Sequence, residues 1–168
     1  PGGTPSYTDT SMDNGMHTYS VIAKTGEGQS KAVSKRAYIG EDVPAEVENL
    51  NAYVSEGQTI ITWNAPTKGM NKGYINTENL TYTVERKTDN GTEVIAEGIK
   101  ERQYTDKVSA GALHSYIVTA SNNTGTSKPI TSNAVISYGD DMKDISAGMN
   151  ANTEYGNPYL LFDFSHRY

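Results

Sequence analysis

The stretch SYTDTSMDNGMHTYSVIAKTGEGQSK, residues 6–31, has a similar counterpart later in the chain, QYTDKVSAGALHSYIVTASNNTGTSK, residues 103–128. With a shift of 97 positions, 12 of the 33 residues from 7 to 39 coincide with their counterparts without a gap. The coincident residues are Tyr7, Thr8, Asp9, His17, Tyr19, Val21, Ala23, Gly28, Ser30, Lys31, Ala37 and Ile39. Such a register indicates an internal duplication, and its period has the size of a small domain rather than of a solenoid unit.

Only one copy of the repeat is whole. We expect it over residues 43–138, the complete repeat, while residues 1–40 hold the C-terminal part of an earlier copy, the partial repeat. A few strands without their partners leave an open edge and an uncovered apolar face. We therefore expect the partial repeat to be ordered only when a missing segment or a neighbouring chain covers it.

Alternation of apolar and polar residues dominates the complete repeat. In TIITWNA, NLTYTVERK and SYIVTAS the large apolar side chains recur at alternate positions, which is typical of strands with one buried face. Asn90 and Gly91 tolerate positive φ and predict a hairpin turn between two of these strands. Seven strands are predicted, over residues 46–54, 58–64, 79–88, 92–97, 102–106, 114–121 and 131–137. The predicted core residues are Trp63, Tyr82, Val84, Tyr116 and Val118, with Tyr19 in the partial repeat.

Three motifs follow one another in the complete repeat. VPAEVENLNAYVSEGQTIITWNAP (43–66) carries Trp63 and then Pro66; LTYTVER (80–86) and HSYIVTASNNTGTS (114–127) come after it. This ordered set resembles the fibronectin type III family over residues 43–138, and over 4–40 as a partial second copy. The resemblance implies an all-β, seven-stranded immunoglobulin-like sandwich preceded by part of another.

The resemblance also implies a role for two tyrosines. Tyr19 and Tyr116 match the tyrosine of the tyrosine corner, whose ring fills the core while its hydroxyl reaches a backbone group in the preceding connection. The family usually has Leu six residues before this tyrosine, whereas Asp13 and Ala110 stand there. We therefore expect the corner before that strand to pack differently.

Composition argues against several classes of function. The formal net charge is −6, from 14 basic and 20 acidic residues, so a nucleic acid or an anionic membrane surface is not the expected partner. The absence of Cys excludes disulfides and thiolate chemistry. No stretch approaches the 18 or more apolar residues of a membrane-spanning helix.

Candidate catalytic and metal-binding groups are scattered. His17 and His114 occupy equivalent positions, and we interpret both as half-exposed residues at a strand entry rather than as ligands. His166 stands alone, and the carboxylates around Glu85 and Glu93 are interpreted as solvated strand faces. The sequence therefore predicts no enzyme activity, no metal site and no cofactor.

Two loops are the candidate contact surface. The long connection 66–79 and the turn 122–126 are expected at the same end of the sandwich, and in the resembled family such loops often make the contacts. The candidate partner-binding residues are Met70, Tyr74, Asn122 and Asn123. An exposed aromatic or Met side chain binds well at low entropic cost. The alternative is an ordinary loop with Tyr74 folded over the edge of the core.

Acidic segments follow each copy of the repeat. Residues 41–44 and 139–143 are predicted to be short joints of limited freedom. Residues 144–168 include YLLFDF and are predicted to start a further, β-rich domain, or to form an ordered tail on the complete repeat.

We interpret the chain as a non-catalytic spacer or docking region of a bacterial secreted or surface protein. Its expected location is extracellular or on the cell surface. Its expected partners are adjacent domains of the same polypeptide and a protein or glycan bound through the loops. Two alternatives stay open: an accessory region of a polysaccharide-degrading enzyme, and a glycan-binding module completed by the segment after residue 143.

Overall fold

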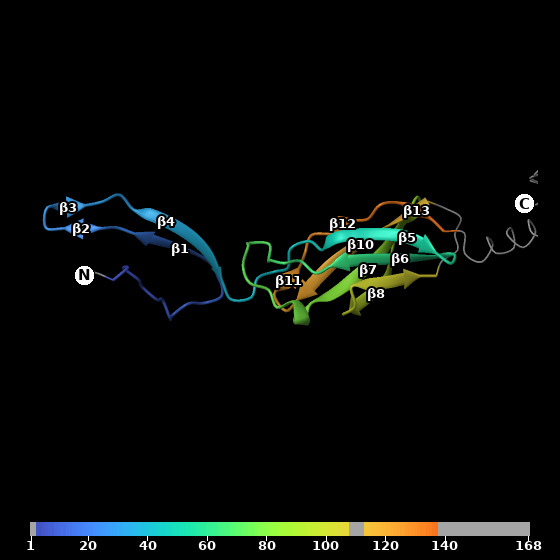
Figure 1. Ribbon diagram of the computed structural model, residues 1–168, viewed down its shortest axis with the longest axis horizontal. Helices are drawn as coiled ribbons and strands as arrows, with labels where there is room; N and C mark the ends of the chain where they lie inside the picture. Colours follow the sequence, from blue (N-terminus) through green and yellow to red (C-terminus); the bar gives the residue numbers. More distant parts are fainter. Residues whose placement is uncertain (1–2, 108–112, 138–168) are drawn as a thin grey trace, which may run out of the picture.

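The computed structural model describes residues 3–107 and 113–137 (Figure 1). The partial repeat contributes β1 (Gly15–Val21), β2 (Lys24–Thr25), β3 (Gly28–Gln29) and β4 (Val33–Ile39). The complete repeat contributes β5 (Glu48–Ser55), β6 (Gln58–Asn64), the 3-10 helix η1 (Thr77–Asn79), β7 (Thr81–Thr88), β8 (Gly91–Ile99), β9 (Gln103–Asp106), β10 (Leu113–Asn122), β11 (Gly125–Thr126), β12 (Ile130–Thr131) and β13 (Val135–Ile136). Figure 1 shows the partial repeat as a hairpin at one end and the complete repeat beyond it.

The complete repeat is built from two antiparallel sheets. One has the order β5-β6-β9, and the other has the order β8-β7-β10 with β11, β12 and β13 along the far edge of β10. The last three pieces together serve as one strand, so that seven strands form a sandwich. The immunoglobulin-like sandwich predicted from the sequence is confirmed.

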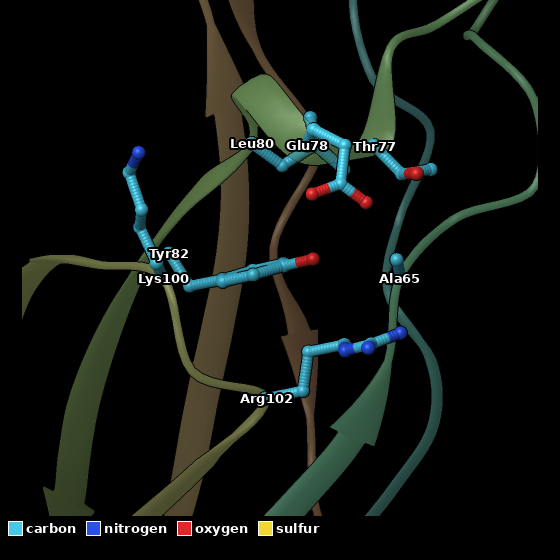
Figure 2. A pocket seen from close by; sticks show the side chains of 7 residues that line it. All are labelled: Ala65, Thr77, Glu78, Leu80, Tyr82, Lys100 and Arg102. Atoms are coloured by element: carbon cyan, nitrogen blue, oxygen red, sulfur yellow. The ribbon is translucent and has the colours of Figure 1, made fainter.

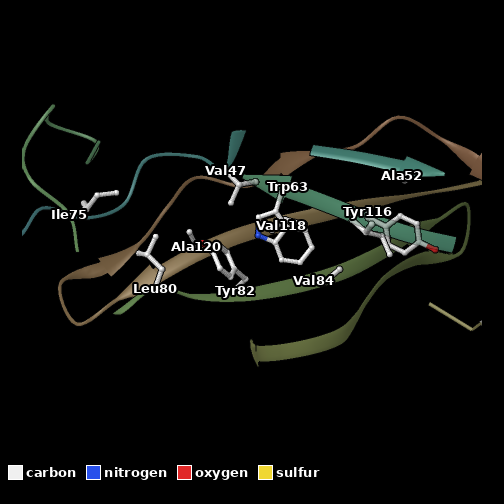
Figure 3. Close-up of a cluster of buried hydrophobic side chains, with 11 residues drawn as sticks. Val47, Ala52, Trp63, Ile75, Leu80, Tyr82, Val84, Tyr116, Val118 and Ala120 are labelled. Carbon is white, nitrogen blue, oxygen red and sulfur yellow. The ribbon is translucent and has the colours of Figure 1, made fainter. Parts of the chain in front are cut away.

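The core lies between the two sheets (Figure 3). Trp63 on β6 packs against Tyr82 on β7 with ring centroids 5.4 Å apart and the planes inclined by 65°, an edge-to-face pair that joins the two layers. Val84, Tyr116 and Val118 are fully buried in the same cluster. Among the described residues, Trp63 Nε1 has no hydrogen-bond partner, so this residue contributes ring volume rather than polar contacts.

The partial repeat is a two-stranded hairpin. β1 pairs with β4 without a bulge from Gly15↔Ile39 to Val21↔Val33, and β2 pairs with β3 at its tip. Val21 is 71% exposed and Val33 is 75% exposed. The hairpin therefore shows the uncovered apolar face that was expected for it.

Several local details differ from the sequence-based expectation. The strand predicted from residue 79 begins at Thr81, because the preceding residues form η1, capped by the Asn76 side chain, which accepts from the backbone N–H of Glu78. In the hairpin between β7 and β8, Thr88 pairs with Gly91, and of the expected pair only Gly91 has positive φ, at 133°. Ala110 and the predicted segments 139–143 and 144–168 lie outside the described residues.

No helix within residues 3–107 and 113–137 has the length and apolar character needed to cross a membrane.

Candidate functional site

The joint between the two repeats, residues 41–44, lies in contact with the long loop 66–79. The N–H of Asp42 donates to the carbonyl oxygen of Tyr74 at 2.7 Å, and the N–H of Met70 donates to the carbonyl oxygen of Val43 at 2.8 Å. Asp42 and Pro44 are fully buried. The joint is therefore part of the folded end of the complete repeat and not a free tether.

The carboxylate of Asp42 is the centre of this contact. Its Oδ2 accepts from the backbone N–H groups of Asn71 at 2.7 Å and Gly73 at 3.1 Å. Its Oδ1 accepts from the Asn71 side-chain amide at 2.9 Å. An isolated buried carboxylate would be strongly destabilising, and successive N–H groups in a turn form a concave anion site that satisfies it. The loop is thus shaped around the side chain of the joint.

Two glycines make this approach possible. A Cβ on Gly69 would overlap the carboxylate of Asp42. A Cβ on Gly73 would lie 2.9 Å from Cβ of Asp42 and 2.9 Å from Cδ1 of Tyr38, a side chain of the partial repeat. Between them, Lys72 adopts a positive φ of 63°. The KGMNKGY segment therefore has glycine where backbone, joint and partial repeat meet.

Asn122 fastens the second loop to the joint. Its side-chain amide donates to the carbonyl oxygen of Asp42 at 2.8 Å and to Oε1 of Glu41 at 3.4 Å. Its Oδ1 accepts from the N–H groups of Thr124 at 2.9 Å and Gly125 at 3.2 Å. Of the predicted contact residues, Asn122 is thus engaged within the chain.

The other three predicted contact residues have exposed side chains. Tyr74 is 67% exposed and Met70 is 42% exposed, although the backbone of each is held by the joint. Asn123 lies at the exposed tip of the turn between β10 and β11. Tyr74 does not fold over the core edge, and partner binding by these residues stays a prediction.

A pocket that sequence reasoning missed lies where loop 66–79 ends (Figure 2). It has a volume of about 200 Å³ and is lined by Ala65, Thr77, Glu78, Leu80, Tyr82, Lys100 and Arg102. Figure 2 shows the Tyr82 hydroxyl pointing into the space between Glu78 and Arg102. Burial raises the pKa of Tyr82, and the positive charge of Arg102 lowers it in part, so the phenol is neutral at physiological pH. The pocket offers a carboxylate, a hydroxyl and a guanidinium together.

His114 differs from the expectation. It is 2% exposed rather than half-exposed, because the inward row of β10 that includes Tyr116 and Val118 begins at this residue. Its ring packs edge-on against Tyr116 at 5.5 Å, and its Nε2 lies 3.4 Å from Oγ1 of Thr59. His17 is half-buried and its Nε2 lies 2.8 Å from the carbonyl oxygen of Asp13. Within the described residues, no three His, Asp or Glu side chains are grouped as a metal site.

Asp106 is the centre of a buried polar cluster that includes Arg86 and Tyr116. Arg86 Nη1 donates to both its carboxylate oxygens, at 3.0 and 2.8 Å, and the Tyr116 hydroxyl donates to Oδ2 at 2.8 Å. Arg86 Nη2 also pairs with Glu93 at 2.7 Å. The expected backbone partner for the Tyr116 hydroxyl is therefore wrong: the acceptor is a side chain of β9. Arg86 continues the inward row of β7, and its charge requires a carboxylate there.

The environment of this cluster shifts two pKa values. Burial raises the pKa of Tyr116; its hydrogen bond with Thr59 lowers it, and Asp106 raises it. Burial alone would lower the pKa of Arg86, but the hydrogen bonds and charges of Asp106 and Glu93 outweigh this and raise it. At physiological pH the cluster holds a neutral phenol beside a charged guanidinium, an arrangement that stabilises structure.

Comparison with solved structures finds similar chains. An Fn3-like protein from Clostridium thermocellum is 30% identical; the match covers 54% of this chain and 92% of that chain, with a TM-score of 0.39. A titin structure is 23% identical, over 74% of this chain and 41% of that chain, with a TM-score of 0.48. A two-domain fibronectin type III segment of chicken tenascin is 16% identical, over 73% of this chain and 65% of that chain, with a TM-score of 0.43.

The chain spans less than half of the titin structure that it matches. No protein-family model matches the chain, and no curated protein sequence matches it.

Proposed function

Because the chain belongs to the fibronectin type III family, we propose that it is a non-catalytic spacer and docking region of a secreted or surface protein. Domains of this fold are commonly structural or linker modules of multidomain proteins. In this proposal residues 1–40 are the end of one domain, residues 43–138 are a complete domain, and the joint fixes the direction between them. A bacterial host and an extracellular location are consistent with the Cys-free sequence and the clostridial match.

The observation that carries this proposal is the buried, hydrogen-bonded position of the Asp42 side chain against the loop 66–79, which we call the seat of Asp42. A spacer sets a distance only if its joints are stiff, and a free acidic tetrapeptide would not be. Here the joint residues form hydrogen bonds, both as donors and as acceptors, with two loops of the following domain. The side chain of Asp42, which lies between these loops, is buried. Each restrained joint residue loses backbone entropy worth about 1–2 kcal/mol, which these bonds offset.

The test measures the freedom of the joint directly. Since the chain has no Cys, Lys35→Cys on β4 and Lys87→Cys on β7 introduce exposed labelling sites, one on each side of the joint. We expect a narrow distance distribution between spin labels in the parent chain and a broader one after Asp42→Ala. Glu46→Ala removes an exposed carboxylate close to the joint and serves as the matched control. Equally broad distributions in all three proteins would contradict a stiff spacer.

Glycan binding is a second candidate function, supported by the pocket at Tyr82. Its carboxylate, hydroxyl and guanidinium are groups that bind sugar hydroxyls and acidic sugars, and the exposed Tyr74 lies on the loop that leads to it. Such binding would suit an adhesive module or an accessory region of a polysaccharide-degrading enzyme. A broad glycan array with the parent chain, Arg102→Ala and Tyr74→Ala tests it. Absence of binding by the parent chain would rule out glycan binding and would leave the spacer proposal unaffected.

A further inference from the structure

The hairpin of the partial repeat carries a row of inward-type residues, of which His17 and Tyr19 are half-buried against residues 12–13, while Val21 and Ala23 are exposed and no other described strand lies over them. Val21 is 71% exposed, while its counterpart Val118 is 0% exposed. Ala23 is exposed, whereas its counterpart Ala120 is 0% exposed. The same residue types at the same repeat positions are therefore buried in one copy and bare in the other.

The two hairpins are equivalent in backbone detail as well as in sequence. In the partial repeat the N–H of Ser30 donates to the carbonyl oxygen of Ala23 at 2.8 Å, and the N–H of Ala23 donates to Oγ of Ser30 at 3.0 Å. In the complete repeat the same two bonds join Ser127 and Ala120 at 2.8 and 3.0 Å. The partial repeat thus presents the same local geometry as the hairpin formed by β10 and β11.

In the complete repeat this hairpin is paired along its second edge and faced by the other sheet. The second edge of β10 pairs with β7, from Ser115↔Lys87 to Ser121↔Thr81, and β5 and β6 supply the facing layer with Trp63. Within residues 3–107 and 113–137, β1 pairs only with β4, and its other edge carries no strand. Figure 1 shows the hairpin without a second layer.

The residues before β1 repeat the β9 motif, but within residues 3–107 and 113–137 they pair with no strand. Tyr7 is 87% exposed, whereas its counterpart Tyr104 lies on β9 beside β6 and donates its hydroxyl to the carbonyl oxygen of Ile95 at 3.0 Å. Tyr7 therefore matches a residue that lies in a paired sheet in the complete repeat, but the described residues include no strand that pairs with it.

We propose that the hairpin β1–β4 binds a fibronectin half-domain of the β5–β9 kind, a segment with the pattern of residues 48–106. Such a segment adds a β7-like strand to the open edge of β1 by backbone hydrogen bonds. It also lays a Trp-bearing sheet over Tyr19 and Val21, as residues 48–106 do for Tyr116 and Val118. The inference does not depend on the spacer role.

A second copy of this chain is the poorer occupant. The β5–β9 strands of each copy already bind its own β10, so a neighbour could offer them only by releasing that hairpin. Such an exchange leaves one hairpin bare for every hairpin covered and gains no buried surface.

The experiment adds the half-domain to the full chain. In an extended chain, a second copy of residues 43–103 replaces residues 1–6, so that Tyr7 follows in the place of Tyr104. We expect amide hydrogen exchange in β1 to slow by more than about tenfold relative to the parent chain. In a second arm, a peptide of residues 43–106 is added to the unaltered chain, which keeps the test valid if the extended chain folds poorly.

Two substitutions make the result specific. Val21→Asp should abolish the slowed exchange in the extended chain, while Thr18→Asp on the opposite face of β1 should retain it. In the unextended chain both should leave exchange unchanged. Unchanged exchange of β1 in both arms overturns the proposal. Protection that instead rises with the concentration of the parent chain alone overturns it in favour of a second copy as the occupant.

Discussion

The hydroxyl of Tyr116 on β10 donates a 2.8 Å hydrogen bond to Oδ2 of Asp106 on β9, and so ties together strands of the two sheets. Asp106 is 5% exposed and Tyr116 is 0% exposed, so water does not replace this bond easily. The interaction joins the layers by a polar contact where Trp63 and Tyr82 join them by an apolar one.

Removal of this hydroxyl should weaken the complete repeat. Tyr116→Phe keeps the ring but leaves a buried carboxylate with one donor fewer, and we expect a loss of about 1–3 kcal/mol in the free energy of unfolding. Urea denaturation followed by Trp63 fluorescence measures it. Tyr104→Phe, which removes the bond to Ile95 from a half-buried ring, is the matched control and should cost less. Equal effects of the two substitutions would contradict the prediction.

Alkaline pH should destabilise the complete repeat through the same residue. Burial raises the pKa of Tyr116 in the folded state above its ordinary value of 10.0. The unfolded chain therefore releases the phenolic proton first, so the contribution of Tyr116 to stability is constant below its ordinary pKa of 10.0 and falls as the pH rises beyond it. Urea midpoints measured between pH 8 and about pH 11 should show a steeper loss in the parent chain than in Tyr116→Phe. Parallel pH profiles would refute this assignment.

The two carboxylate partners of Arg86 should differ widely in importance. The side chains of Arg86 and Asp106 are 12% and 7% exposed, whereas that of Glu93 is 70% exposed. Asp106→Ala leaves a buried guanidinium with one exposed partner and should cost about 3–5 kcal/mol. Glu93→Gln, the matched control, should cost less than about 1 kcal/mol. Thermal unfolding of both variants checks this ranking, and a comparable loss of stability in both would contradict it.

Glycine at position 69 should be required for the stiff joint. Gly69→Ala places a Cβ against the Asp42 carboxylate, and we expect the side chain to leave its seat. The distance distribution between labels at positions 35 and 87 should then broaden as it does for Asp42→Ala. Gly26→Ala, at the open tip of the partial repeat, is the control because nothing lies within 4 Å of its Cβ. A narrow distribution in Gly69→Ala would show that the loop accommodates the methyl group.

Sequence reasoning predicted the sandwich because the alternation and the 97-residue repeat can be recognised from residue types and spacing alone. It missed the seat of Asp42, because the donors are backbone N–H groups of Asn71 and Gly73, which carry no side-chain signature. The glycine spacing in KGMNKGY is the signal that was present.

Burial likewise depends on strands distant in the sequence. His114 begins an inward row, and Arg86 continues one, but their contacts, with Thr59 on β6 and with Asp106 on β9, appear only once those strands are placed. The identical motif around Tyr19 could not predict whether a second layer covers it, because the covering strands are not part of the motif.

The valine pair at positions 21 and 118 gives the most direct measure of that difference. Val118→Ala removes methyl groups from a fully buried site on β10, and we expect a loss of about 2 kcal/mol in the free energy of unfolding. Val21→Ala makes the same chemical change at the equivalent site on β1, which is 71% exposed, so the expected change lies within about 0.5 kcal/mol. Parallel urea titrations of the two variants provide the comparison. A loss at position 21 as large as that at position 118 would mean that the hairpin face is already covered in solution, since an exposed valine has no packed neighbours to lose.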